Sequence, residues 1–260
     1  MDSLNLGLAG KVAIVTGASE GLGRATAERF ADCGAKVAIC ARRKEVLERA
    51  AEEIRRATGG DLLAMTCDVS RPAEIEAFVA AVLSRWGGVD ILVNNAGTGS
   101  AAGFEQVDDA QWQIDIELKL MAAVRLCRLV IPHMKRRGGG RIINVTIVAG
   151  KAPGARVLPT SVSRAAGINL TKALANEYAA DRILVNTICL GVVKSAQWER
   201  RVTGDRETFY REMAKKRGVL LGRFGEAHEF ADLVAFLCSE RAAYITGTAI
   251  NFDGGMSAVV

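Results

Sequence analysis

The stretch that decides the fold is Thr16-Gly17-Ala18-Ser19-Glu20-Gly21-Leu22-Gly23. It ends an apolar run and opens an amphipathic segment, so its three glycines lie between a predicted strand and a predicted helix. Glycine allows a tight turn and lets the backbone approach a pyrophosphate, while the helix N-terminus presents unpaired N–H groups and a positive dipole end. The stretch therefore predicts a dinucleotide-phosphate site, unless the glycines serve only a turn. Its expected contacts are Thr16, Gly17, Ser19, Gly21, Leu22 and Gly23.

Outward from this loop, short apolar runs alternate with segments of helical periodicity along the whole chain. The predicted strands are Lys11–Thr16, Lys36–Ala41, Asp61–Thr66, Val89–Val93, Arg141–Thr146, Ile183–Ile188 and Thr248–Phe252. The predicted helices are Gly21–Cys33, Lys44–Thr58, Pro72–Trp86, Ala110–Lys135, Ser161–Ala179 and Ala227–Ser239. Continuous apolar strands separated by helices indicate a parallel sheet covered on both faces.

We therefore expect an α/β fold with one doubly wound, seven-stranded parallel sheet of the Rossmann type. No composition break divides residues 1–260, which predicts a single domain. One long irregular stretch, roughly 191–225, follows the sixth strand and is expected to form a substrate lid over the crevice.

Composition argues against several classes of function. The 34 Lys/Arg residues are interspersed with 29 Asp/Glu, which argues against a nucleic-acid surface despite a net charge of +5. The six cysteines lack CxxC spacing and the two histidines lie far apart, so no metal site is expected. Neither a signal pattern nor an apolar run of membrane-spanning length is evident, and we expect a cytoplasmic protein with reduced thiols and no membrane contact.

The end of the second predicted strand bears on the choice of cofactor. An acidic residue at this point would bind the ribose 2′-hydroxyl of NAD, but the sequence reads Cys40-Ala41-Arg42-Arg43. Guanidinium groups pair bidentately with phosphate, so Arg42 and Arg43 favour NADP(H), with NAD(H) as the alternative. The other interpretation is that both arginines begin a solvated helix.

Together with the glycine loop, three further motifs make the chain resemble the short-chain dehydrogenase/reductase family over essentially its whole length. They are Asp68-Val69, Asn94-Asn95-Ala96-Gly97, and the ending Ile245-Thr246-Gly247 through Asp253-Gly254-Gly255. The resemblance implies hydride transfer between a nicotinamide and an alcohol or carbonyl. It also implies further cofactor contacts from Asp68, Val69, Asn95, Ala96, Gly97, Arg164, Gly191, Val193 and Ser195.

The family's Asn-Ser-Tyr-Lys tetrad is not preserved. Aligned motif by motif, its four positions hold Lys119, Ile147, Thr160 and Arg164. Thr146 neighbours the serine position, although strand alternation predicts that it faces away from the site. Loss of the tyrosine removes a tuned proton donor, a group worth about 10²–10⁴-fold in rate. Ser→Ile removes an oxyanion donor worth about 10²–10³-fold.

Lys119 is the candidate replacement for the missing acid. Burial and the like charge of Arg164 are expected to lower its pKa and make it a proton donor. Arg164 is expected to bind the nicotinamide ribose in place of lysine. The alternative is that Lys119 faces an interface or pairs with Glu117 or Asp115.

We therefore expect an NADP(H)-preferring oxidoreductase with a remodelled active site. The alternatives are a cofactor-binding pseudoenzyme that serves as a structural or regulatory subunit, or non-redox chemistry with a retained cofactor. The substrate is expected to be a small molecule, with an acyl-CoA or a carboxylate suggested by Trp198, Arg200 and Arg201. The alternative is that these residues only form a solvated amphipathic lid. The resemblance implies a dimer or tetramer, as a homo-oligomer or with an active paralogue.

Overall fold

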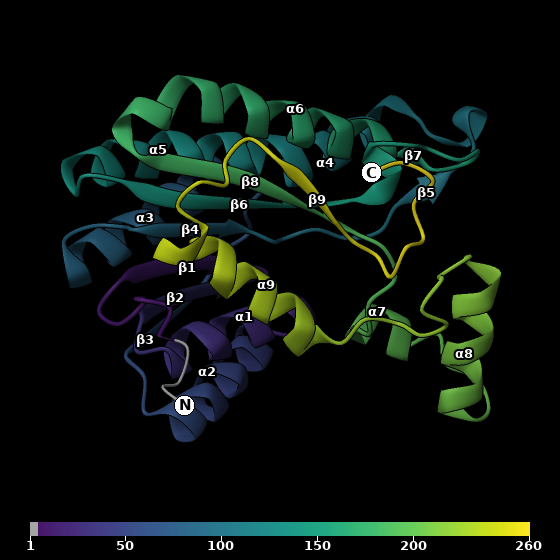
Figure 1. The fold of residues 1–260 in the computed structure, drawn as a ribbon, viewed down its shortest axis with the longest axis horizontal. Coiled ribbons are helices and arrows are strands. Elements are labelled where there is room, and N and C mark those ends of the chain that lie inside the picture. Colours follow the sequence, from purple (N-terminus) through teal and green to yellow (C-terminus); the bar gives the residue numbers. More distant parts are fainter. Residues whose placement is uncertain (1–4) are drawn as a thin grey trace.

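A seven-stranded parallel sheet forms the centre of the computed structural model, which describes residues 5–260. The strand order is β3-β2-β1-β4-β6-β8-β9, which confirms the predicted doubly wound arrangement (Figure 1). The strands are β1 (Val12–Thr16), β2 (Lys36–Ala41), β3 (Leu62–Thr66), β4 (Ile91–Asn94), β6 (Gly140–Ile147), β8 (Ile183–Leu190) and β9 (Ala249–Phe252).

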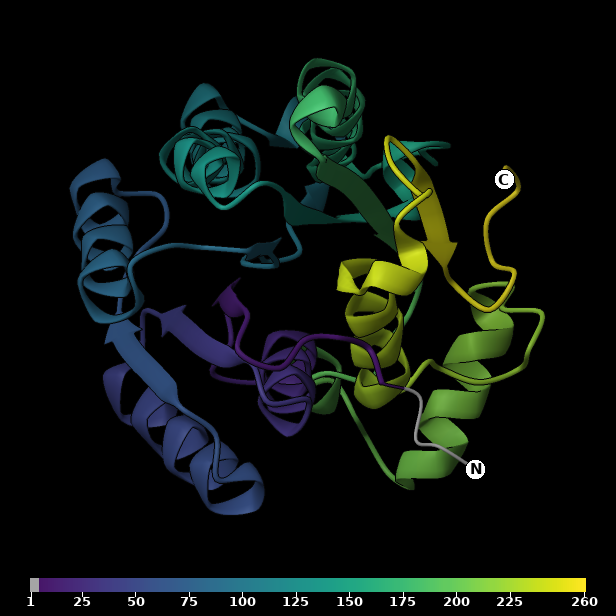
Figure 2. The same cartoon turned by 60° about the vertical axis from the view of Figure 1, so that its left-hand side comes forward.

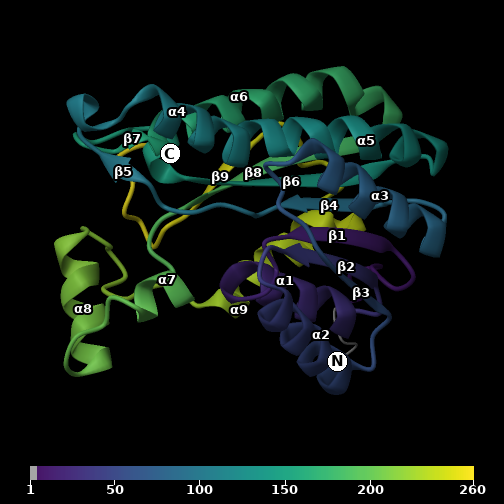
Figure 3. The same ribbon diagram turned by 180° about the vertical axis from the view of Figure 1, so that it is seen from behind.

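Helices cover both faces of this sheet (Figures 1 and 3). One face carries α1 (Gly21–Asp32), α2 (Lys44–Thr58) and α9 (Ala227–Cys238). The other carries α3 (Pro72–Trp86), α5 (Ala122–Arg136) and α6 (Thr160–Tyr178). Alternate strand residues supply the two cores: Val15 and Ile39 pack toward the first face, and Ile14 and Cys40 toward the second. The two-residue period of a strand therefore explains why these runs are apolar throughout.

The predicted helix Ala110–Lys135 is confirmed as one unbroken helical run, Asp109 to Arg136, but the run is not α-helical throughout. It consists of α4 (Asp109–Ile116), one turn of π-helix (Glu117–Met121) and α5. A π turn inserts one extra residue into the helix and is often found at functional sites. Lys119 lies in the middle of this turn and is buried.

The stretch 191–225 was predicted to be irregular, and the structure shows that it is partly helical. It contains α7 (Ala196–Glu199) and α8 (Arg206–Lys216), and Asp205 caps α8 by accepting the N–H of Thr208 at 2.9 Å. We call residues 191–225 the lid, after the role expected from the sequence, and Figures 1 and 2 show α8 at one end of the molecule. The lid has its own apolar interior, the lid cluster, separate from the two cores beside the sheet: Val192, Tyr210, Ala214, Val219 and Phe224.

A second, two-stranded sheet was not predicted from the sequence. It pairs β5 (Ala101–Ala102) with β7 (Leu158–Pro159) in antiparallel fashion, with Ala101 opposite Pro159. This pairing places Ser100 beside Thr160, which lies 60 residues later in the chain. Within residues 5–260, no helix has both the length and the apolar character to cross a membrane.

Candidate functional site

The glycine loop lies between β1 and α1, as predicted. Gly17 has φ +65°, and a Cβ there would lie 2.8 Å from the Cα of Ala96. At Gly23 a Cβ would lie 2.5 Å from both the Asn95 side chain and the Gly17 carbonyl oxygen. Any side chain at these positions would therefore displace backbone, and the loop keeps a close, side-chain-free approach to the start of α1.

Thr16 and Asn95 join this loop to the end of β4. The Thr16 hydroxyl accepts the backbone N–H groups of Asn95 and Ala96, both at 3.0 Å. The Asn95 amide donates to the carbonyl oxygens of Thr16 at 2.8 Å and Gly17 at 3.2 Å. These bonds hold two family motifs, which are about 80 residues apart in the chain, in one rigid crevice.

The residues expected near the adenosine ribose lie at the ends of β2 and β3. Arg42 and Arg43 are both exposed, and Arg43 donates to Glu20 in the glycine loop. Burial opposes ionisation of Asp68, but its bonds from the N–H and hydroxyl of Ser70, with the charge of Arg42 nearby, lower the pKa of its carboxyl. This edge of the sheet, at the ends of β2 and β3, therefore carries both cationic and anionic side chains.

A ladder of buried polar side chains positions α6, the helix that carries Thr160 and Arg164. Asn94 donates to Asn144 at 2.8 Å, and Asn144 donates to Thr171 on α6 at 2.8 Å. The Thr171 hydroxyl lies 2.6 Å from that of Thr187 on β8. Connected buried networks of this kind favour a single arrangement of the elements they join, although Asn94 Oδ1 has no hydrogen-bond partner among the described residues.

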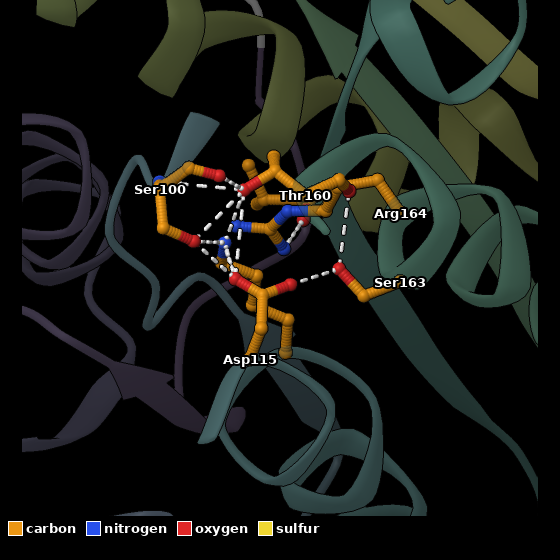
Figure 4. Close-up of polar contacts among 7 residues, drawn as sticks. Ser100, Asp115, Thr160, Ser163 and Arg164 are labelled. Atoms are coloured by element: carbon orange, nitrogen blue, oxygen red, sulfur yellow. Dashed lines mark hydrogen bonds and ion pairs between the residues drawn. The ribbon is translucent and has the colours of Figure 1, made fainter. Parts of the chain in front are cut away.

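Ser100, Asp115, Thr160 and Ser163 form the polar cluster of the candidate active site (Figure 4). Hydrogen bonds place Lys119 in the same cluster. Its ammonium forms an ion pair with Asp115 and donates to Thr160 Oγ1 at 2.7 Å and Ser100 Oγ at 3.3 Å. The side chain is 0% exposed. Both interpretations of Lys119 from the sequence therefore hold in part: it reaches the tetrad region, and it pairs with Asp115. Glu117 instead binds Arg125 at 2.6 Å.

The electrostatics of the pair follow from its burial. Burial, together with the charge of Arg164, lowers the pKa of the Lys119 ammonium, although Asp115 opposes this shift. Burial alone would raise the pKa of Asp115, but hydrogen bonds from Lys119, Ser100 and Ser163 leave it below its usual value. Ser100 and Ser163 donate to the carboxylate at 2.5 and 2.6 Å. A lowered pKa makes the Lys119 ammonium a stronger acid than a solvated lysine.

Arg164 lies at the inner wall of the crevice. It is 9% exposed and donates to the carbonyl oxygen of Val145 at 2.7 Å. A Cβ on Gly97 would collide with its guanidinium, so the Asn95-Ala96-Gly97 turn makes room for this side chain. Burial lowers the pKa of Arg164 to about 10. Its Nε is buried without a hydrogen-bond partner among the described residues. An orphaned donor beside the Asn95-Ala96-Gly97 turn fits a polar ligand such as a ribose.

The remaining predicted residues lie in different places. Ser195 faces the glycine loop, because a Cβ on Gly21 would be 3.7 Å from its Cβ. Val193 forms a bridge with Gly225 at the base of the lid. Thr146 faces β8, with its hydroxyl 3.2 Å from Cys189 Sγ, and it is not part of the Lys119 cluster. Ile147 is half-buried and supplies no side-chain polar atom.

Ser100, Asp115 and Ser163 were not predicted as site residues. For Asp115 a signal existed: it precedes Lys119 by four residues, which puts both on one helix face. Ser163 lies in the first turn of α6, where polar residues are common, and no motif singles it out. Ser100 has no local signal, because the β5–β7 pairing brings it to the site. Residues 5–260 contain no group of three or more His, Cys, Asp or Glu side chains able to hold a metal ion.

Comparison with known proteins gives consistent matches over the full fold. The profile of a family described as enoyl-(acyl carrier protein) reductase matches residues 17–257. The 3-oxoacyl-(acyl-carrier-protein) reductase FabG of Vibrio cholerae is 37% identical over 251 residues, which cover 96% of this chain and 99% of that protein.

Two solved structures are also similar. L-sorbose reductase from Gluconobacter frateurii, complexed with NADPH and L-sorbose, has a TM-score of 0.94 at 38% identity, covering 99% of this chain and 100% of its own. An NADPH-bound short-chain oxidoreductase from Pseudomonas aeruginosa PAO1, described as containing an atypical catalytic center, has a TM-score of 0.93 at 35% identity. That match covers 96% of this chain and 98% of its own.

Proposed function

The chain belongs to the short-chain dehydrogenase/reductase family, and from this premise we propose that it is an NADP(H)-dependent carbonyl reductase whose proton comes from Lys119. One observation carries the proposal. The buried ammonium of Lys119 lies 2.7 Å from Oγ1 of Thr160, and Thr160 is the residue that aligns with the family's tyrosine. The similar structures include a reductase and a short-chain oxidoreductase, each with NADPH bound, which supports both the reaction class and the cofactor.

The residues of the crevice fit a dinucleotide. The loop Gly17–Gly23 would receive the pyrophosphate at the start of α1, and Arg42 and Arg43 would bind the 2′-phosphate. The Nε–H group of Arg164, which has no partner among the described residues, would donate a hydrogen bond to the nicotinamide ribose. The bound nicotinamide supplies a hydride equivalent to a carbonyl carbon.

Lys119 supplies the proton that must accompany this reduction. Its lowered pKa makes the ammonium a stronger acid than a solvated lysine, so it gives up a proton more readily as negative charge develops on the carbonyl oxygen. Asp115 keeps the group ionised before reaction by opposing the effect of burial. Asp115 is thus a positioning residue, whose carboxylate fixes Lys119 at the end of the crevice.

The charge of the lid supports an anionic substrate. Residues 191–225 contain nine Lys/Arg and four Asp/Glu, which leaves 25 of each sign in the rest of the chain. The entire net charge of +5 therefore resides in the lid. A cationic surface attracts anionic ligands at long range and raises their association rate.

A cavity of about 380 Å³ lies between α7 and α8 in the same region. Its lining combines aromatic and apolar groups with three cations: Trp198, Arg201, Phe209, Met213, Lys216 and Arg217. The guanidinium of Arg201 lies 5.1 Å from the centre of the Trp198 ring. We propose that the substrate is an acyl-CoA or an apolar carboxylate whose anionic part binds here.

Two exposed apolar side chains near the site could form a subunit interface, because the family resemblance implies an oligomer. Ile114 on α4 is 66% exposed and Val162 on α6 is 48% exposed. Both belong to the helices that carry the Lys119 cluster. We propose that this face forms a homodimer or homotetramer interface; an active paralogue would use the same face.

The first experiment is a titration of the purified protein with NADPH and NADH, followed by cofactor fluorescence and thermal unfolding. Ligand at about 100 times its Kd stabilises the folded state by about 2.7 kcal/mol, so tight binding raises Tm.

A screen of carbonyl substrates would follow, with Lys119→Ala tested beside Lys172→Ala, which removes a lysine outside the cluster. Turnover unaffected by Lys119→Ala would refute the mechanism. Binding without turnover would favour the pseudoenzyme, or non-redox chemistry.

A further inference from the structure

The ammonium of Lys119 has no hydrogen left for a substrate. A protonated lysine has three N–H donors, and here they are directed to Asp115, Thr160 and Ser100. The side chain is also 0% exposed. Lys119 therefore stores a proton behind other side chains, and a neighbouring group must deliver it.

Thr160 does not fulfil this role, although it stands at the family's tyrosine position. It is only 6% exposed, and its hydroxyl donates to the carbonyl oxygen of Ser100. Asp115 and Ser163 are 3% and 1% exposed. These three groups complete the interior of the cluster.

Ser100 is the member of the cluster that is open to solvent. Its Oγ accepts from Lys119 at 3.3 Å and donates to Asp115 at 2.5 Å. Its backbone is held by the β5–β7 pairing and by the bond from Thr160, so the hydroxyl is fixed at the mouth of the cluster.

We propose that Ser100 is the catalytic proton donor, which rests on the reductase function proposed above. With substrate bound, the Ser100 hydroxyl would turn its hydrogen from Asp115 to the substrate's carbonyl oxygen. The Ser100 O–H bond then breaks as a new O–H bond forms on that oxygen, while a bound dihydronicotinamide would supply the hydride to the carbon. Ser100 then takes a proton from Lys119 Nζ, which leaves a neutral amine beside the Asp115 carboxylate. After the alcohol leaves, water returns one proton to Lys119 through Ser100.

Kinetics test the delivery step. Ser100→Ala removes the hydroxyl and should lower kcat for carbonyl reduction by about 10²–10⁴-fold while leaving the Kd for NADPH unchanged. Ser100→Thr keeps a hydroxyl at the same atom and should retain most of the activity. Activity in Ser100→Ala equal to that of the parent would overturn the proposal.

A second measurement needs no substrate. In protein labelled with ¹⁵N-lysine, nuclear magnetic resonance follows exchange of the Lys119 ammonium hydrogens with D₂O. If Ser100 is the path to water, Ser100→Ala slows this exchange. Loosening of a merely structural contact would accelerate it, and equal or faster exchange overturns the proposal. A parent protein that reduces no carbonyl would defeat the reductase function alone, because exchange would still decide the role of Ser100.

Discussion

Asp115 and Lys119 illustrate how a pair of side chains serves chemistry at some cost to stability. Both are almost completely buried, and each would be an isolated charge without the other. Burial of an ion pair is often no more stabilising than a well-packed apolar pair, whereas removal of one partner leaves an uncompensated charge. The pair is thus better explained by its position beside Ser100 than by its contribution to the fold.

This view predicts the behaviour of Asp115→Asn. We expect the free energy of unfolding to fall by about 3–5 kcal/mol, because the Lys119 charge loses its counter-ion. The double variant Asp115→Asn with Lys119→Met should recover much of this loss. Urea unfolding at neutral pH without cofactor provides the measurement. A double variant no more stable than Asp115→Asn would show that the unpaired charge is not the cause.

The pH dependence of turnover is a second prediction at this scale. Reduction requires protonated Lys119, whose pKa burial lowers below 10.5, so kcat should fall as the pH rises through that lowered pKa. Asp115 opposes the lowering, so in Asp115→Asn the fall should begin at lower pH. A pH profile of kcat for both proteins gives the answer. If kcat fell over the same pH range in both proteins, Lys119 would not be the acid.

Among single residues, the sequence could identify those in motifs or at motif positions. Lys119, Thr160 and Arg164 were placed in this way, and all lie in or beside the observed cluster. Ser100 could not be found because serine is common in loops, and only the pairing of two distant short strands gives it a partner. The spacing of Asp115 and Lys119 predicts their ion pair. It does not reveal that Asp115 also accepts hydrogen bonds from Ser100 and Ser163, which lie on other segments.

At the scale of elements, long periodic segments were predictable and local irregularities were not. Helices α2 and α3 begin and end at the predicted residues, since their apolar faces and the glycines that follow them leave little choice. The π turn at Lys119 escaped prediction because it shifts the helical period by a single residue. The helix α8 was missed although Asp205 supplies a standard N-cap.

The junction of β2 and α2 carries the prediction for cofactor choice. Replacing both Arg42 and Arg43 by Ala should weaken NADPH binding by about 10- to 100-fold, as expected for loss of charged hydrogen bonds worth about 1.5–3 kcal/mol. NADH binding should change little. Glu20→Gln provides a matched control, because it frees Arg43 from its ion pair and should strengthen NADPH binding. Equal losses for the two cofactors would contradict 2′-phosphate recognition.

At the scale of the whole molecule, the net positive charge lies in the lid and not in the rest of the chain. The sheet and its helices are electrically balanced, and the surplus of five positive charges lies in the lid. Such a distribution affects encounter with ligands more than the stability of the sheet. Salt should therefore act on binding steps that involve the lid.

The corresponding prediction concerns ionic strength. For an acyl-CoA or carboxylate substrate, KM should rise with added salt, whereas an uncharged carbonyl substrate should show little change. Arg201→Glu with Arg217→Glu should raise KM for the anionic substrate selectively. Arg49→Glu on α2 is the control for total charge, since Arg49 is exposed far from the lid. Salt-independent KM for both substrate types would refute an anionic substrate.

The separate interior of the lid cluster gives this chain a modular route to new specificity. Tyr210, Ala214 and Phe224 pack with one another, apart from the cores that hold the sheet. Substitutions in parts without shared contacts combine nearly additively. A grafted or diversified segment 196–224 would thus leave the crevice, with Ser195 against the glycine loop, and the Lys119 cluster in place. Selection could then exchange substrates while the residues expected to bind the cofactor stay the same.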